Sequence, residues 1–341
     1  SASFSTTLTG TDKDDFALTT GGVLTFAATT DFESPVCGVD NDSNTCNITA
    51  TITDGTNSST QAITITVTNV NDNNPVFSSS TSESINEGET SVSTVVAGDD
   101  DVGDTIAYSI DSTGREDHAL FAIDASTGAL TMTAPDFENP TDTFGTAGDN
   151  VYGVTVLATD SGTPANTATH DISVTVIDTN DNSPVLTAAA SYSVAEGDTA
   201  VGTVTTADAD AGATFTYTLT GTDAASFEIT KTEGTQAGVL AFKAASAPDF
   251  ETKTSYSLNV VVSDGDNETT EAIVVNITDE NDNSPVLTAN ETYSVAEGAT
   301  AVGTVTTTDA DAGTTFTYTS VSYTHLRAHE TRHDGVCRLL L

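Results

Sequence analysis

The sequence predicts an all-β protein of tandem β-sandwiches with Greek-key connections, joined end to end. Short stretches alternate between apolar and polar residues, as at residues 62–67, which is typical of half-buried strands. Thr, Ser and Val dominate and Trp is absent, a composition that favours β-structure. Four sequence motifs also recur in register, which indicates repeated units of about a hundred residues.

The motifs keep matching spacings along the chain. The triplet Asn-Asp-Asn begins at residues 71, 180 and 281, so successive copies are 109 and 101 residues apart. The same two spacings separate Glu-Gly pairs beginning at Glu87, Glu196 and Glu297, and Asp-x-Asp pairs beginning at Asp99, Asp208 and Asp309. Asp-Phe-Glu occurs at 31–33, 136–138 and 249–251. Residues 183–218 and 284–319 match without a gap at all but six positions.

These motifs divide the chain into repeats. Repeat 1, residues 1–70, is the back part of a unit. Repeat 2, residues 76–179, and repeat 3, residues 184–280, are complete, and repeat 4, residues 285–319, is the opening of a unit. Each complete repeat is long enough to bury a core, though only marginally. Because the chain begins in mid-pattern, we expect it to be a fragment of a longer protein.

Residues 320–341 break the pattern, and we expect an unrelated, artefactual tail there. The tail contains His329-Glu330-Thr331-Arg332-His333, which matches the His-Glu-x-x-His motif of zinc peptidases. We expect no zinc site, because the match lies eight residues from the end of the chain without a surrounding domain. Residues 322–331 also resemble translated sequencing-adaptor read-through.

Charge narrows the choice of partner. Eight Lys and Arg residues against 50 Asp and Glu residues give a net charge of −42. Nucleic acids and anionic membrane surfaces repel such a chain, so we expect no nucleic-acid partner. No segment is apolar enough to insert into a membrane. The excess of acidic over basic residues suits a scaffold that binds hard cations.

Two of the three cysteines, Cys37 and Cys46, bracket a short polar loop. A disulfide between them would suit an extracellular protein. Free buried thiols are the alternative, which the polarity of the loop disfavours.

Acidic residues concentrate around the linker between repeats 2 and 3. Alternate residues of a strand face the same way, so we expect the two carboxylates of Asp136-Phe137-Glu138 to share a side while Phe137 faces the core. The same reasoning pairs Asp208 with Asp210. Two carboxylates about 5 Å apart repel by roughly 3 kcal/mol at an effective dielectric of about 20. Calcium resolves this repulsion, because it takes about six to eight oxygen ligands in loose geometry.

Taken together, the motifs resemble those of cadherin repeats, over residues 1–319. The resemblance implies an immunoglobulin-like sandwich for each repeat and about three Ca²⁺ ions at each complete junction. The Ala-Glu-Gly and Asp-Ala-Asp-Ala-Gly motifs look more like those of large bacterial surface proteins with such repeats than those of animal adhesion molecules. The family's adhesive tip Trp is absent from this sequence.

The resemblance also implies the Ca²⁺ ligands, position by position. The first junction would use Asp31, Glu33, Asn71, Asp72, Asn73, Asp99, Asp101 and Asp160. The second would use Glu87, Asp136, Glu138, Asn180, Asp181, Asp208, Asp210 and Asp264, and the backbone carbonyls of Thr179 and Asn182. The third would use Glu196, Asp249, Glu251, Asn281, Asp282, Asn283, Asp309 and Asp311. We expect the outer junctions to be weakened, since the first lacks its Glu and the third its late Asp.

The resulting hypothesis is a non-enzymatic, extracellular segment of a cell-surface protein, for calcium-dependent adhesion or as a rigid spacer. Its partners would be other cell-surface proteins or glycans, or further copies of itself. The alternative is a polysaccharide-binding or passive arm of a larger secreted enzyme or adhesin.

Overall fold

The computed structural model describes residues 5–232, 235–288 and 292–320, and it confirms the predicted all-β fold. Within these ranges the regular elements are strands and four short 3₁₀ helices. None of the described helices has the length and apolar character of a membrane span. The His-Glu-x-x-His motif and the predicted tail beyond residue 320 lie outside the described residues. The chain divides into two units, one up to Thr179 and one from Asn180, which are described separately.

Repeat 1, in the first unit, contains two small sheets. Its elements are β1 (Ser5–Thr9), η1 (Lys13–Asp15), β2 (Phe16–Leu18), β3 (Leu24–Phe26), β4 (Thr45–Thr53) and β5 (Ser58–Thr66). One sheet has the order β1-β4-β5 and the other pairs β2 with β3. The predicted disulfide between Cys37 and Cys46 is confirmed, and both cysteines are buried in the small core with Phe16 and Ile48.

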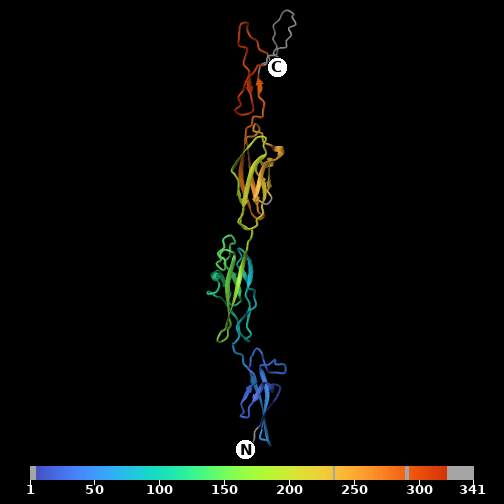
Figure 1. Ribbon diagram of the computed structural model, residues 1–341, viewed down its shortest axis with the longest axis vertical. Helices are drawn as coiled ribbons and strands as arrows, with labels where there is room; N and C mark the ends of the chain where they lie inside the picture. The colour runs from blue at the N-terminus through green and yellow to red at the C-terminus, as the bar shows by residue number, and fades with distance from the viewer. Residues whose placement is uncertain (1–4, 233–234, 289–291, 321–341) are drawn as a thin grey trace. The chain divides into compact units, whose positions relative to one another are not determined.

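Repeat 2, in the same unit, is a sandwich of two sheets around one core (green in Figure 1). Its first elements are β6 (Val76–Phe77), β7 (Ser82–Asn86), β8 (Ser91–Thr94), β9 (Ala97–Gly98) and β10 (Ala107–Ile110). The others are η2 (Glu116–Leu120), β11 (Phe121–Ile123), β12 (Ala129–Met132), β13 (Val151–Thr159) and β14 (Thr167–Ile177). The sheets have the orders β10-β13-β14-β7 and β11-β12-β8, with β6 and β9 paired separately.

Repeat 3, in the second unit, has the same plan. Its first elements are β15 (Val185–Thr187), β16 (Ser191–Ala195), β17 (Ala200–Ala207), β18 (Thr216–Thr220) and η3 (Ala224–Ser226). The others are β19 (Phe227–Lys231), β20 (Ala237–Phe242), η4 (Ala244–Ser246), β21 (Ser255–Ser263) and β22 (Glu268–Thr278). The sheets have the orders β15-β17-β20-β19 and β16-β22-β21-β18. Repeat 4 contributes β23 (Val286–Thr288) paired with β24 (Thr306–Thr308).

The last strand of each complete repeat shows why the alternating sequence folds this way. In β22, Ile273, Val275 and Ile277 are buried while the residues between them are exposed. Alternation with a period of two places one face of the strand in the core and the other in water. The same strand pairs in parallel with β16, so both strands end at the same edge of the sheet. The chain leaves that edge directly into the Asn-Asp-Asn linker, which positions the candidate site.

Candidate metal centres

In repeat 2 a buried glutamate gathers the linker-proximal loops. Glu87 follows β7 directly, and its carboxylate accepts hydrogen bonds from the N–H groups of Phe137 and Thr179, both at 2.8 Å. Because β7 and β14 run parallel, the residue after each strand reaches the same edge, which brings Asp178 beside Glu87. Glu87, Glu138 and Asp178 each place a carboxylate oxygen within 4.8 Å of the others.

Repeat 3 contains the same arrangement. Glu196 follows β16 and accepts hydrogen bonds from the N–H groups of Phe250, at 2.8 Å, and Glu280, at 2.6 Å. Its carboxylate forms a second cluster with Glu251 and Asp279, and one oxygen of each lies within 4.8 Å of the others. Two repeats of different sequence therefore build one geometry from a Glu-Gly turn, an Asp-Phe-Glu loop and the end of the last strand.

The electrostatics of these clusters follow from their hydrogen bonds. Burial alone would raise the pKa of Glu87, but the N–H donors of Phe137 and Thr179 lower it overall. Burial raises the pKa of Glu251, and the negative charges of Glu196 and Asp279 add to the effect. In the repeat 3 cluster, full ionisation of Glu196, Glu251 and Asp279 is therefore unfavourable unless a cation is bound.

A second type of cluster surrounds the Asp-x-Asp pair of repeat 3. Asp208 follows β17 and Asp264 follows β21, and together with Asp210 they bring carboxylate oxygens within 4.8 Å of one another. The linker joins this cluster from the same unit. Asn180 donates to Asp264 at 3.2 Å, and the side chain of Asn182 donates to Asp210 at 2.7 Å.

Several buried oxygens in this cluster have no hydrogen-bond partner among the described residues: Asn180 Oδ1, Asp208 Oδ2 and Asp264 Oδ2. The first Asp of the Asp-x-Asp motif has such an oxygen in every copy, since Asp99 Oδ2 and Asp309 Oδ2 are also buried and without a hydrogen-bond partner among the described residues. A buried acceptor without a donor costs free energy, so one repeated at three equivalent positions calls for a ligand. The ligand atoms of both cluster types are oxygens, which suits Ca²⁺ better than a soft metal.

The linker residues after repeat 1 make the corresponding contacts within the first unit. Glu33, Asp72 and Asp101 form an acidic cluster in which one carboxylate oxygen of each residue lies within 4.8 Å of the others. Asn73 donates from its backbone N–H to Asp101 at 2.9 Å. Asn71 donates to Asp160 at 3.1 Å and leaves its own side-chain oxygen unpartnered.

The linker after repeat 3, in the second unit, resembles the linker after repeat 1. Burial raises the pKa of Asp282, and the carboxylates of Glu196, Asp311 and Asp249 raise it further. Asn283 donates from its side chain to Asp311 at 2.9 Å. The remaining predicted residues have these local contacts or exposures: Asp31 and Asp136 cap the backbone N–H groups of Glu33 and Asn139, Asp249 caps that of Thr252, Asp181 accepts from Asn182, and Asn281 is exposed.

One local prediction is wrong. The Asp-Phe-Glu and Asp-x-Asp motifs do not lie in strands, so the alternate-residue argument does not apply to them. Both motifs form bends in which an aspartate carboxylate accepts a nearby N–H: Asp208 accepts from Asp210 at 3.3 Å. Phe137 is partly buried against the core, as predicted, although it is in a loop.

Asp178 and Asp279 were missed by the sequence analysis. Each stands two residues before Asn-Asp-Asn and directly after the last strand of its repeat. Their equal position relative to the triplet was the available signal. The corresponding residue after repeat 1 is Asn69, whose buried side-chain oxygen has no hydrogen-bond partner among the described residues.

Comparison with known proteins adds family evidence. Residues 81–177 match the cadherin domain family. The chain is 34% identical over 260 residues to mouse cadherin EGF LAG seven-pass G-type receptor 2 and 31% identical over 269 residues to mouse protocadherin Fat 4. These matches span 72% and 73% of this chain but only 8% and 5% of the relatives. Both relatives are mouse proteins, and neither supports the predicted likeness to bacterial surface proteins.

Solved structures agree on the fold. The protocadherin GammaB4 extracellular domain superposes with a TM-score of 0.63 at 24% identity, covering 91% of this chain and 49% of that one. Mouse cadherin-23 EC22–24 superposes with a TM-score of 0.54 at 24% identity, covering 81% and 86% of the two chains. At this level of identity the structural likeness concerns the fold.

Proposed function

This chain belongs to the cadherin repeat family, and on that premise we propose that it is a calcium-dependent adhesion and spacer segment of an extracellular protein. Ca²⁺ bound at the linkers would restrict the bending of one repeat against the next. The chain matches only a small part of its curated relatives, so the adhesive role of the whole protein belongs to this proposal.

The observation that carries the proposal is the repeated unpartnered oxygen of the Asp-x-Asp motif. Asp99, Asp208 and Asp309 each keep a buried carboxylate oxygen without a donor among the described residues. None of the three takes part in an ion pair with the few basic side chains of the described residues. A hard divalent cation would satisfy these oxygens and offset the repulsion within each acidic cluster.

The residues present would hold the ion mainly through carboxylates. In repeat 3 they are Asp208, Asp210 and Asp264, with the side-chain oxygen of Asn180. Next to Glu87 they are Glu138 and Asp178. We expect affinities of about 10⁻⁴–10⁻³ M, as in other extracellular calcium modules, so extracellular calcium would fill the sites and cytosolic calcium would not.

Small-angle X-ray scattering of the chain tests the mechanical part of the proposal. Scattering extrapolated to infinite dilution should give a larger maximum dimension with excess Ca²⁺ than with EGTA. The Asp181→Ala variant should respond less to Ca²⁺ than wild type, because it removes a carboxylate from the second linker. Identical profiles of the wild-type chain in both conditions would refute stiffening by calcium.

A further inference from the structure

The Asn-Asp-Asn linkers before repeats 2 and 3 make contacts that need no metal. In the second unit the backbone carbonyl of Asn182 accepts a hydrogen bond from the side-chain amide of Asn267, at 2.9 Å. In the first unit the side-chain amide of Asn166 donates to the carbonyls of Asn71, at 3.3 Å, and Asn73, at 2.8 Å. Each amide therefore joins a linker to the repeat that follows it.

Asn166 and Asn267 have the same place in their repeats. Each directly precedes the last strand, β14 in repeat 2 and β22 in repeat 3. Each also ends a turn that begins at an acidic residue. The N–H of Asn166 donates to the carboxylate of Asp160 at 2.9 Å, and the N–H of Asn267 donates to that of Asp264 at 2.7 Å.

The two turns differ in length, so local turn geometry does not explain the shared contact. Asn166 comes six positions after Asp160, whereas Asn267 comes three positions after Asp264. The carbonyl of each Asn also accepts the N–H of its Asp, at 3.1 and 3.2 Å. Because backbone groups of the Asn close both turns, its side-chain amide is left to bind the linker.

The third residue of each triplet is held at both of its backbone groups. The N–H of Asn182 donates to Asp210 at 3.1 Å, and the N–H of Asn73 donates to Asp101 at 2.9 Å. The carbonyl of the same residue accepts the amide described above. These contacts restrict the linker within each unit.

The held carbonyl of Asn182 is also an expected Ca²⁺ ligand. A backbone carbonyl has two lone pairs, so it can accept the amide of Asn267 and still coordinate a cation. Partners of this kind orient the ligands of a metal ion. A ligand that is in place before the ion arrives also lowers the entropy cost of binding.

We propose that Asn166 and Asn267 are positioning residues, whose side-chain amides hold each linker on the following repeat without metal and orient its carbonyl for Ca²⁺. The orienting role rests on the proposed function, whereas the holding of the linker does not. Part of the ligand set would then be in place in the calcium-free chain.

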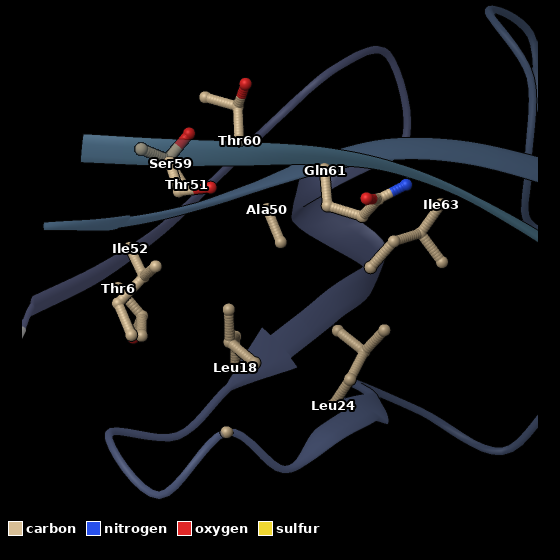
Figure 2. Close-up of a pocket in the computed structure, with 11 residues that line it drawn as sticks. Thr6, Leu18, Leu24, Ala50, Thr51, Ile52, Ser59, Thr60, Gln61 and Ile63 are labelled. Atoms are coloured by element: carbon tan, nitrogen blue, oxygen red, sulfur yellow. The ribbon is translucent and has the colours of Figure 1, made fainter.

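The pocket of repeat 1 takes no part in these contacts. Figure 2 shows its lining, which includes the apolar side chains of Leu18, Leu24 and Ile63. Its described lining residues include no carboxylate and no residue of a linker. Neither the acidic clusters nor the linker contacts therefore extend into it.

Reciprocal alanine variants of the full chain test the proposal. Asn267→Ala should release the linker at Asn182 and leave Asn73 unchanged, and Asn166→Ala should do the reverse. Asn276→Ala makes the same substitution at an exposed position of β22 and is the control. Hydrogen exchange of single amides is measured by NMR in EGTA, so that the holding of the linker is observed without calcium.

We expect the N–H of Asn182 to exchange about 2- to 10-fold faster in Asn267→Ala than in wild type or Asn276→Ala, the factor that one net hydrogen bond supplies. The N–H of residue 267 should keep its protection, because Ala retains the group that Asp264 accepts. Unchanged exchange of Asn182 overturns the proposal. Equal loss of protection at both amides also overturns it, since that would indicate an opened turn.

A calcium titration followed at the Asn182 amide resonance tests the orienting role. We expect the calcium affinity of this linker to fall about 2- to 10-fold in Asn267→Ala and to stay at the wild-type value in Asn276→Ala. Faster exchange with unchanged calcium affinity overturns the orienting role. A wild-type chain without any calcium response would refute the proposed function, whereas the exchange rates in EGTA would still decide whether the amides hold the linkers.

Discussion

Replacing Glu87 by Gln tests how the buried glutamate stabilises repeat 2. Glu87 is 7% exposed, and its carboxylate accepts three hydrogen bonds, from Phe137 N–H and from the N–H and hydroxyl of Thr179. Gln keeps one acceptor oxygen and turns an NH₂ group toward an N–H donor. Losing charged hydrogen bonds at a buried site costs about 2–3 kcal/mol, which lowers the melting temperature of one repeat by about 10–20 °C.

The pH dependence separates this effect from a packing defect. The folded-state pKa of Glu87 lies below its ordinary value of 4.5, so its stabilisation is present above that pH and is lost as the pH falls through the folded-state pKa. The difference in unfolding free energy between wild type and Glu87→Gln should therefore stay constant above about pH 4.5 and narrow as the pH falls below that value. The Gln side chain is neutral over this pH range, so it adds no pH-dependent contribution to stability.

Differential scanning calorimetry in EGTA gives the measurement without a contribution from bound calcium. The control is Glu89→Gln, which makes the same change at an exposed position two residues later and should leave the transition unchanged. Equal melting temperatures for wild type and Glu87→Gln at neutral pH would refute the role of this carboxylate. A difference that stays constant down to acid pH would refute its electrostatic origin.

Three further predictions concern other parts of the chain. Reducing the Cys37–Cys46 disulfide should destabilise repeat 1 by about 2–3 kcal/mol and leave the transitions of repeats 2 and 3 in place, which calorimetry with and without reductant checks. Asp117→Asn should destabilise repeat 2 by about 2–3 kcal/mol, because the buried carboxylate holds the N–H groups of Thr143, Phe144 and Gly153; Glu116→Gln is the control, and urea unfolding the assay. Limited proteolysis should cut the linkers around residues 71–73, 180–182 and 281–283 faster in EGTA than in Ca²⁺, and equal rates would contradict calcium ordering of the linkers.

The strands were the most predictable part of the molecule. Apolar residues that alternate with polar ones, such as Ile273, Val275 and Ile277, predict a strand and its buried face from the local sequence alone. The disulfide was predictable for a similar reason, because its cysteines bracket one short loop. Repeat self-comparison added the long-range register that a single strand lacks.

The sequence predicted which motifs contribute residues to the acidic clusters, but it did not predict the conformation of these loops. Asp-Phe-Glu and Asp-x-Asp look like strand segments by residue spacing, yet hydrogen bonds from backbone N–H groups to Asp side chains bend them. Such competition depends on distant partners, for instance Glu87 accepting from Phe137 fifty positions away. Asp178 and Asp279 escaped prediction because the copy after repeat 1 has Asn69 in their place, which hid the repetition.

We propose that the unpartnered oxygens around Asp208 form a calcium site. Equilibrium dialysis of ⁴⁵Ca²⁺ against the wild-type chain, Asp208→Asn and the exposed control Asp198→Asn measures binding at this site. We predict saturable binding with Kd values of about 10⁻⁴–10⁻³ M for wild type and control, and loss of at least about tenfold in affinity at one linker in Asp208→Asn. Absence of saturable binding by the wild-type chain, or equal binding by Asp208→Asn and Asp198→Asn, would contradict calcium binding around Asp208.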